Sequence, residues 1–294
     1  MKRLWGIAFL LMVPAAAWGD AAVWVAEKGG ERVFLAGTIH MLRPTDYPLP
    51  VEFGQAYGQA DILYLETDVE RMESPALAGE LLRRMTLPSG RTLEDELSPE
   101  AYAALQAYAG ARGISLQGLQ RFKPAMVILS LLGLELERLG VAAEGVDSFM
   151  YRKARRDGKA VAELESVEEQ LDHLAAMGKG RESAFVRYSL DDLERTDELM
   201  DELIAAWRRG DTQALGELFV TDMKRAFPDL YANLLVKRTR QWLPRVEEMF
   251  HEPGTELVLV GAAHLVGEEG LLALLERRGY RIRPLEAETT KHAK

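Results

Sequence analysis

The sequence contains no cysteine. This absence excludes disulfide bridges, thiolate metal sites, a cysteine nucleophile and a lipid-modified cysteine at a processing site. With 294 residues, 48% of them hydrophobic, the chain is long enough to bury a sizeable core. That core must therefore stabilise the protein without covalent cross-links.

Basic residues are in the minority. The chain has 36 lysines and arginines against 46 aspartates and glutamates, for a formal net charge of −10. A chain this acidic has no general affinity for nucleic acid or for anionic lipid. We therefore expect no nucleic acid as a partner.

Long hydrophobic runs are missing beyond the first residues. There, two basic residues precede the apolar stretch 4–13, and small residues dominate positions 15–19. This pattern predicts a cleavable signal peptide, residues 1–19, cut near Gly19, and its apolar stretch is too short to span a bilayer comfortably. We expect residues 20–294 to form a single domain that is periplasmic or secreted and makes no stable membrane insertion.

Histidine is scarce, and two of the five histidines share one sequence context. The apolar run 33–36 leads into Gly37-Thr38-Ile39-His40, and the run 257–260 leads into Gly261-Ala262-Ala263-His264. Each copy predicts a buried strand followed by Gly-x-x-His. Working groups of α/β sheets lie beyond the carboxyl ends of the strands, so two neighbouring strands would bring both imidazoles to one crevice. The other histidines lie in a helical run, after a helix end and in the tail: His173, His251 and His292.

The remaining pattern predicts the fold class. A hairpin is expected over 22–36, and a helix around 51–60 leads into the strand Ile62 to Leu65. This order makes the two strands parallel and places His40 and Glu66 at the same edge. Apolar periodicity predicts a helical insertion over about 98–250 that contains one strand at 160–165. We expect an α/β (α+β) fold with a central mixed β-sheet flanked by helices.

Three helices can be predicted in more detail. Apolar residues at helical spacing with acidic residues between them predict one long amphipathic helix over 182–209. A helix over 229–250 is expected to be interrupted or kinked at Pro244. Near the end of the chain, Glu268 and Glu269 are expected to begin a helix that closes at Gly279.

The strand-end residues form a candidate metal site. His40, His264 and Glu66 offer two nitrogens and one carboxylate, a typical open site for a divalent ion. Such an ion would lower the pKa of bound water and supply a hydroxide near neutral pH. Asp68 is an alternative to Glu66 for the same role. A single Gly-x-x-His has little specificity, whereas two matched copies with a carboxylate nearby favour a functional site.

The sequence resembles the TraB/GumN family, which is related to the Tiki proteases. The resemblance covers nearly the whole mature chain. Beyond the two Gly-x-x-His elements, it rests on segments spread along the sequence: Asp46 to Pro50, Leu65-Glu66, Phe122-Lys123-Pro124, Gly145-Val146-Asp147, Leu164 to Leu171, Arg238 to Trp242, and Leu265.

This resemblance implies an exported metal-dependent hydrolase, most readily a peptidase. His40, His264 and Glu66 would bind a divalent ion (manganese, cobalt or zinc), with Glu66 as ligand or general base. Arg238 would be a catalytic cation that binds a carboxylate or steadies an oxyanion. Glu163 or Glu165 would add a second carboxylate, or Glu165 would instead cap or buttress the following helix. The substrate would be a peptide or a small molecule. The family often has Arg-Asn where this chain has Arg238 followed by Thr239.

Two alternatives come with the same resemblance. In the related erythromycin-esterase-like proteins a histidine activates water without metal, so His40 or His264 could be the base itself. The related ChaN-like proteins bind haem or iron, so the site could hold a metal or a porphyrin and catalyse nothing. Family membership alone does not decide among these chemistries.

Overall fold

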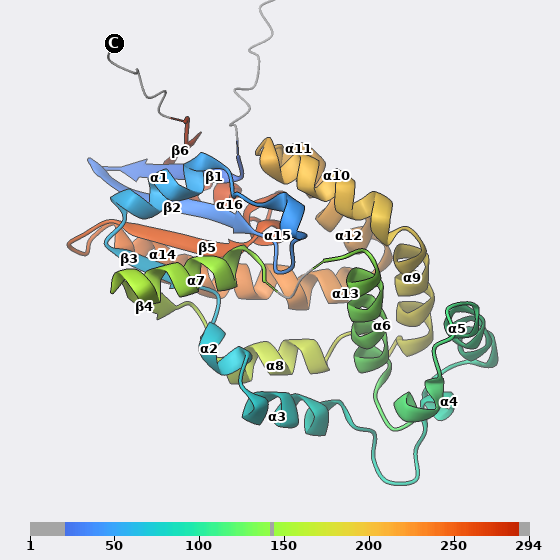
Figure 1. Ribbon diagram of the computed structural model, residues 1–294. Helices are drawn as coiled ribbons and strands as arrows, with labels where there is room; N and C mark the ends of the chain where they lie inside the picture. Colours follow the sequence, from blue (N-terminus) through green and yellow to red (C-terminus); the bar gives the residue numbers. More distant parts are fainter. Residues whose placement is uncertain (1–20, 142–143, 288–294) are drawn as a thin grey trace, which may run out of the picture.

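The computed structural model describes residues 21–141 and 144–287. The expected signal peptide lies outside the described residues. A six-stranded mixed sheet forms the centre of the fold, in the order β4-β3-β5-β2-β1-β6 (Figure 1). Its strands are β1 (Val23–Lys28), β2 (Glu31–Thr38), β3 (Ile62–Leu65), β4 (Ala160–Glu163), β5 (Glu256–Gly261) and β6 (Arg281–Pro284). This architecture confirms the predicted fold class.

The strands that carry the site are parallel. β5 pairs with β2 on one side and with β3 on the other, whereas β1 pairs antiparallel with both β2 and β6. The register places Thr38 opposite Gly261, so both Gly-x-x-His elements leave the sheet at the same edge. The two strands are neighbours, which is the condition for both histidines to reach one crevice. β3 is separated from β2 by β5, although its end reaches the same edge.

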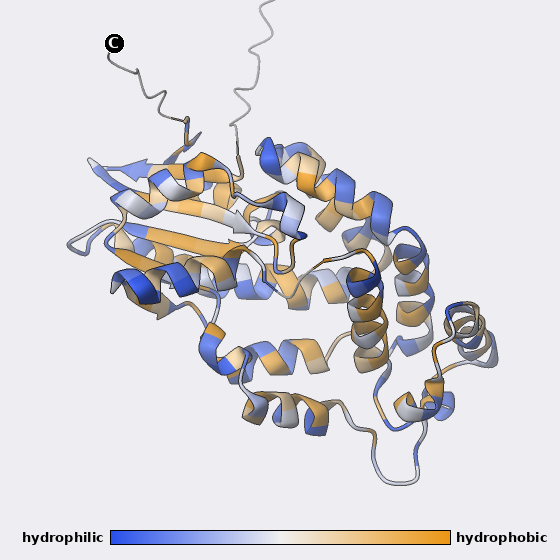
Figure 2. Cartoon of the chain, viewed as in Figure 1, coloured by the Kyte–Doolittle hydropathy of each residue, from blue (hydrophilic) through white to orange (hydrophobic). Residues whose placement is uncertain are grey.

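Strand β5 is buried along its whole length because it lies in the middle of the parallel strands. Its run of leucine and valine is typical of a strand covered on both faces. In the view of Figure 1, helices α1 (Val51–Gln59) and α7 (Val146–Asp157) lie in front of the sheet. Helices α14 (Lys237–Met249) and α16 (Leu271–Arg277) lie behind it. Figure 2 shows these strands as mostly hydrophobic and the helices as mixed.

The helical part of the chain lies beyond the carboxyl edge of the sheet (Figure 1). Part of it forms an apolar cluster separate from the cluster around the sheet, whereas other helices of this part, including the one that carries Trp207, belong to the sheet cluster. Its helices are α2 (Val69–Met72), α3 (Pro75–Met85), α4 (Leu93–Glu96), α5 (Pro99–Ala111), α6 (Pro124–Arg138), α8 (Val167–Ala175), α9 (Glu182–Glu194), α10 (Thr196–Arg208), α11 (Thr212–Gly216), α12 (Asp222–Ala226) and α13 (Pro228–Tyr231). Among the described residues, no helix has the length and apolar character needed to cross a membrane.

The expectation of one helix over 182–209 is wrong. The chain forms α9 and α10, which meet at Arg195. The Thr196 hydroxyl donates a hydrogen bond of 3.0 Å to the Leu193 carbonyl at this junction. The reason for the break is packing, because Leu193 of α9 belongs to the helical cluster whereas Trp207 of α10 belongs to the sheet cluster.

Two further helix predictions need correction. Helix α14 continues through Pro244, and the irregularity lies earlier, in the π-helical segment Ala232–Val236. The last helix begins at Leu271 rather than at Glu268, with Gly270 as its N-cap. Gly279 follows that helix with a φ of 83°, in the left-handed conformation expected of a C-terminal glycine.

Candidate functional site

His40 follows β2 and is held by the loop that opens α7. The Val146 N–H donates to the Ile39 carbonyl at 3.0 Å, and His40 Nδ1 lies 3.2 Å from Asp147 Oδ1. Gly145 makes this contact possible, because a Cβ there would lie 2.2 Å from the His40 carbonyl carbon. The surrounding protein would lower the pKa of His40, but the Asp147 and Glu66 carboxylates outweigh this effect and raise it to about 9.

Glu66 follows β3 and is buried. The Gly261 N–H donates to its Oε1 at 2.6 Å, and Arg238 Nη2 donates to its Oε2 at 2.6 Å. Burial alone would raise the pKa of Glu66, but the neighbouring imidazole and guanidinium groups and the Gly261 N–H hold it at about 2. Glu66 is therefore a carboxylate at any physiological pH.

His264 lies in the short helix α15 (Ala262–Leu265), directly after β5, and is only 3% exposed. Its Nε2 is 3.1 Å from Arg238 Nη1, and its Nδ1 is 2.8 Å from Thr239 Oγ1. A guanidinium can only donate, so Nε2 accepts and the ring proton belongs on Nδ1, which donates to Thr239. Burial, aided by the Arg238 charge, outweighs Glu66 and lowers the pKa of His264 to about 3.

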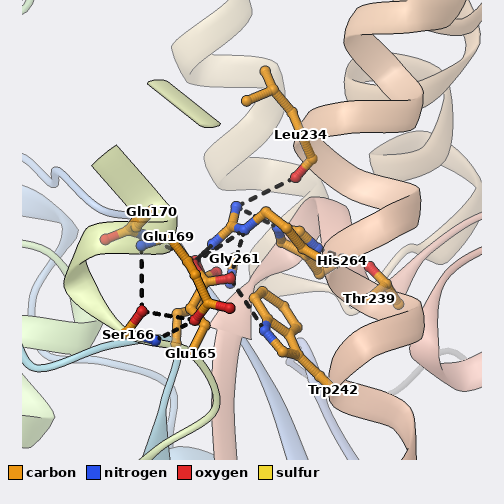
Figure 3. A network of polar contacts seen from close by, with 11 residues as sticks. Glu165, Ser166, Glu169, Gln170, Leu234, Thr239, Trp242, Gly261 and His264 are labelled. Carbon is orange, nitrogen blue, oxygen red and sulfur yellow. Dashed lines mark hydrogen bonds and ion pairs between the residues drawn. The ribbon is translucent and has the colours of Figure 1, made fainter. Parts of the chain in front are cut away.

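Arg238 comes from α14 and links the buried acids. Its Nε donates to both oxygens of Glu165 at 3.1 and 3.0 Å, and its Nη2 donates to Glu165 Oε1 at 2.7 Å. Glu165 follows β4, and its backbone N–H donates to the Glu66 carbonyl, which brings the two acids side by side. Figure 3 shows the Trp242 indole between Glu165 and His264, with Nε1 donating to Glu165 at 3.2 Å. We call Arg238, Glu66, Glu165 and His264 the arginine cluster.

Gly261 is the point around which the strand-end residues gather. A Cβ at this position would lie 3.2 Å from Glu66 Oε1, 3.6 Å from His40 Nε2 and 3.7 Å from His264 Cδ2. The three predicted metal ligands therefore converge, together with Arg238, on a cavity of about 560 Å³ at the carboxyl edge of the sheet. Most of the other residues that line this cavity are apolar. They come from the ends of β3 and β5, from α2, α8, α10 and α15, and from the two π-helical segments, Glu217–Thr221 and Ala232–Val236.

The expected metal site can be tested against the donors that are present. His264 Nε2 and Glu66 Oε2, which would be metal ligands, already accept hydrogen bonds from Arg238. Within residues 21–141 and 144–287, no group of three or more histidines, aspartates or glutamates is arranged to hold a metal ion. The ligand set is therefore brought together, but it does not fit a divalent ion while Arg238 holds this position.

Of the other candidate acids, only Glu165 belongs to the arginine cluster. Asp68 Oδ1 accepts the Arg71 N–H at 2.9 Å and caps α2, so it is not part of the cluster. Glu163 ends β4 and is exposed, whereas Glu165 is in the cluster. Asp147 was not predicted as a site residue, although it lies in the Gly145-Val146-Asp147 segment that contributes to the family resemblance. The sequence pattern also set His173 aside, and His173 lines the cavity.

Comparison with known proteins agrees with this architecture. The model of the TraB/PrgY/gumN family matches residues 22–284, so the chain belongs to this family. It is 27% identical over 281 residues to the uncharacterized protein YbaP of Escherichia coli K12, covering 94% of this chain and 97% of YbaP. It is 24% identical over 302 residues to the metalloprotease TIKI1 of Danio rerio, covering 85% of this chain and 60% of TIKI1. No solved structure matches the chain.

Proposed function

We propose that this protein is an exported hydrolase that cleaves peptide bonds in the cavity at the carboxyl edge of the sheet. The observation that carries the proposal is the gathering of His40 Nε2 and Glu66 Oε1 around Gly261, beside a fixed guanidinium. Membership of the family and the similarity to a named metalloprotease support a hydrolytic reaction. Export rests on the signal sequence expected at residues 1–19.

The proposed chemistry uses exposed His40 and buried Glu66, both of which line the cavity. A water between His40 Nε2 and Glu66 Oε1 is oriented by the carboxylate and gives its proton to the imidazole as its oxygen attacks the substrate carbonyl carbon. Asp147 holds the proton of neutral His40 on Nδ1 and stabilises the imidazolium that forms. The imidazolium then gives its proton to the departing amine nitrogen. This balances the hydrolysis, because one water is consumed and the histidine is regenerated.

The lining of the cavity supports a proposal for the class of substrate. Apolar side chains dominate the lining, including Met72, Leu203 and Phe219. Two buried hydroxyls that line it, on Thr38 and Thr67, have no hydrogen-bond partner among the described residues. An apolar wall with a few polar atoms is typical of a pocket for a small ligand or an extended peptide. We therefore propose peptides with a bulky apolar side chain beside the cleaved bond.

Two versions of this reaction are possible, and they differ in whether a metal ion takes part. The similarity to the Danio rerio metalloprotease TIKI1 favours a metal-dependent hydrolase. The contacts of Arg238 favour the version in which a histidine and a carboxylate activate water directly. A protein that only binds metal or haem would show no turnover, so a turnover assay separates this alternative from both.

The test is a peptide-cleavage screen of the mature protein with mass-spectrometric readout of the new termini. His40→Ala is compared with His251→Ala, a histidine outside the cavity lining. The expected result is cleavage beside apolar residues that His40→Ala abolishes and His251→Ala retains. Cleavage that survives in His40→Ala, or no cleavage of any peptide in the library, would contradict the proposal.

A further inference from the structure

Arg238 is surrounded by acceptors on every side. Its Nε–H points to Glu165, and its Nη2 donates to Glu66 and to Glu165. Its Nη1 donates to the Leu234 carbonyl at 3.3 Å and to His264 Nε2 at 3.1 Å. A guanidinium has five N–H groups, and these contacts use all five. Arg238 therefore has no donor left over for an oxyanion or for a substrate carboxylate in this arrangement.

The acceptors around Arg238 are those that a divalent ion would use. Two carboxylates, one imidazole nitrogen and one backbone carbonyl form a mixed oxygen and nitrogen donor set, which suits manganese, cobalt or zinc. In this protein the same atoms accept hydrogen bonds from a cation of the chain itself, the guanidinium of Arg238. The indole of Trp242 lies against the guanidinium at 4.8 Å and closes one side of the cluster.

A divalent ion and Arg238 therefore compete for the same oxygen and nitrogen atoms. An ion held by His40, Glu66 and His264 would need the Nε2 lone pair of His264, which Arg238 occupies. If Arg238 stayed close by, its positive charge would face a dication at short range in a buried place. If Arg238 swung out, Glu165 would lose its main partner. Both routes weaken metal binding.

We propose that Arg238 is the resident cation of this site and takes the place of a divalent metal. Its role is to position Glu66, Glu165 and His264, as a metal would, while His40 and Glu66 face the substrate. Removal of the guanidinium would then create a divalent-ion site from the donors that it leaves behind. This inference concerns metal affinity, so its outcome does not depend on whether the proposed hydrolysis is found.

The experiment measures the binding of manganese, cobalt and zinc to the metal-stripped mature protein by calorimetry. Wild type is compared with Arg238→Ala and with Arg240→Ala, an exposed arginine on the same helix that pairs with Glu269. We expect no stoichiometric binding to wild type or to Arg240→Ala. We expect one equivalent on Arg238→Ala, with an affinity about 10- to 100-fold above any weak binding to wild type. Millimolar guanidinium should compete with the metal in Arg238→Ala alone.

Two further variants keep the test decisive. Arg238→Gln retains neutral donors toward the glutamates and replaces Arg238→Ala if that variant unfolds, with the same gain expected. Arg238→Lys retains a positive charge and should bind no better than wild type. One equivalent on wild type that His264→Ala abolishes would overturn the proposal. So would the absence of any gain in the folded, uncharged Arg238 variants.

Discussion

The two Gly-x-x-His elements have the same local sequence pattern and opposite surroundings. His40 is 60% exposed at its side chain, faces the cavity and pairs with Asp147, which raises its pKa. His264 is buried between a guanidinium, a hydroxyl and an indole, and its pKa is lowered. The strand and the glycine place a histidine at the sheet edge, but the segments that pack on it decide its chemistry. We therefore assign proton transfer to His40 and a positioning role to His264.

The largest effects should come from exchanging each histidine for alanine. His40→Ala removes the group that moves protons, so kcat/KM for a cleaved peptide should fall by about 10²- to 10⁴-fold. The free energy of unfolding should change little, since the side chain is exposed. His264→Ala leaves buried donors without an acceptor and should lower the free energy of unfolding by about 2–4 kcal/mol.

Urea unfolding and peptide cleavage, measured on both variants, test this division. Equal losses of stability in the two variants would contradict it, as would full activity in His40→Ala.

The two glycines should differ in the same way. A methyl group at Gly261 enters the space between Glu66 and His40, so Gly261→Ala should reduce kcat/KM by about 10- to 100-fold. A methyl group at Gly37 would lie 3.2 Å from Ala262, inside the packed core. Gly37→Ala should therefore lower the free energy of unfolding by about 1–3 kcal/mol. Kinetics and thermal unfolding of the pair would show whether activity and stability separate as expected.

The pH dependence should also separate the histidines. With a pKa of about 9, His40 is protonated at neutral pH, so kcat/KM should rise with pH toward about 9 as the base form appears. Asp147→Asn removes the first of the two carboxylates that raise this pKa, so the midpoint of the profile should move to lower pH. Histidine NMR titration provides an independent readout. A midpoint that does not move would exclude Asp147 as the cause.

The pKa values of His264 and Glu66 are shifted downward, whereas that of His40 is shifted upward. Both folded-state pKa values lie below the ordinary values of 6.5 and 4.5. The stabilisation is therefore present above the ordinary value in each case. It is lost as pH falls from 6.5 toward about 3 for His264 and from 4.5 toward about 2 for Glu66. The free energy of unfolding should accordingly decrease through this acid range.

The smallest effect should come from Thr239. Thr239→Val keeps the shape but removes the acceptor of the His264 ring proton, and it should cost about 1–2 kcal/mol of stability. Thr239→Asn restores the residue that the family often has and retains an acceptor, so it should be less destabilising. Differential scanning calorimetry of the two variants measures this difference. A Thr239→Val variant as stable as wild type would show that the hydroxyl is not needed.

Much of this arrangement could be predicted from the sequence because it depends on local pattern. The apolar runs at 33–36, 62–65 and 257–260 predicted strands. The repeated Gly-x-x-His pointed to a common site at the ends of the first and last of these strands. The partners of the histidines could not be predicted in this way. Asp147 reaches His40 only because Gly145, which has no Cβ, packs against the His40 backbone. Such a contact leaves no periodic signal in the sequence.

The role of Arg238 could not be predicted from the sequence either. The resemblance pointed to the residue, but its saturation by five acceptors depends on how α14 docks against three strand ends. The break between α9 and α10 was also missed, because both helices are amphipathic and only their different packing partners separate them. Local pattern therefore located the strands, whereas long-range packing fixed the roles of the residues at their ends.

The placement of β5 between β2 and β3 has a consequence for biosynthesis. Glu66 and Gly261, which share a hydrogen bond, are 195 positions apart in the chain. The strand that joins the two parts of the site is thus synthesised long after the strand that leads to Glu66. Contacts between such distant segments form slowly, because a long loop must close first. A chain truncated before residue 256 would lack the middle strand, so we expect partial products to have an incomplete site and no activity in the proposed reaction.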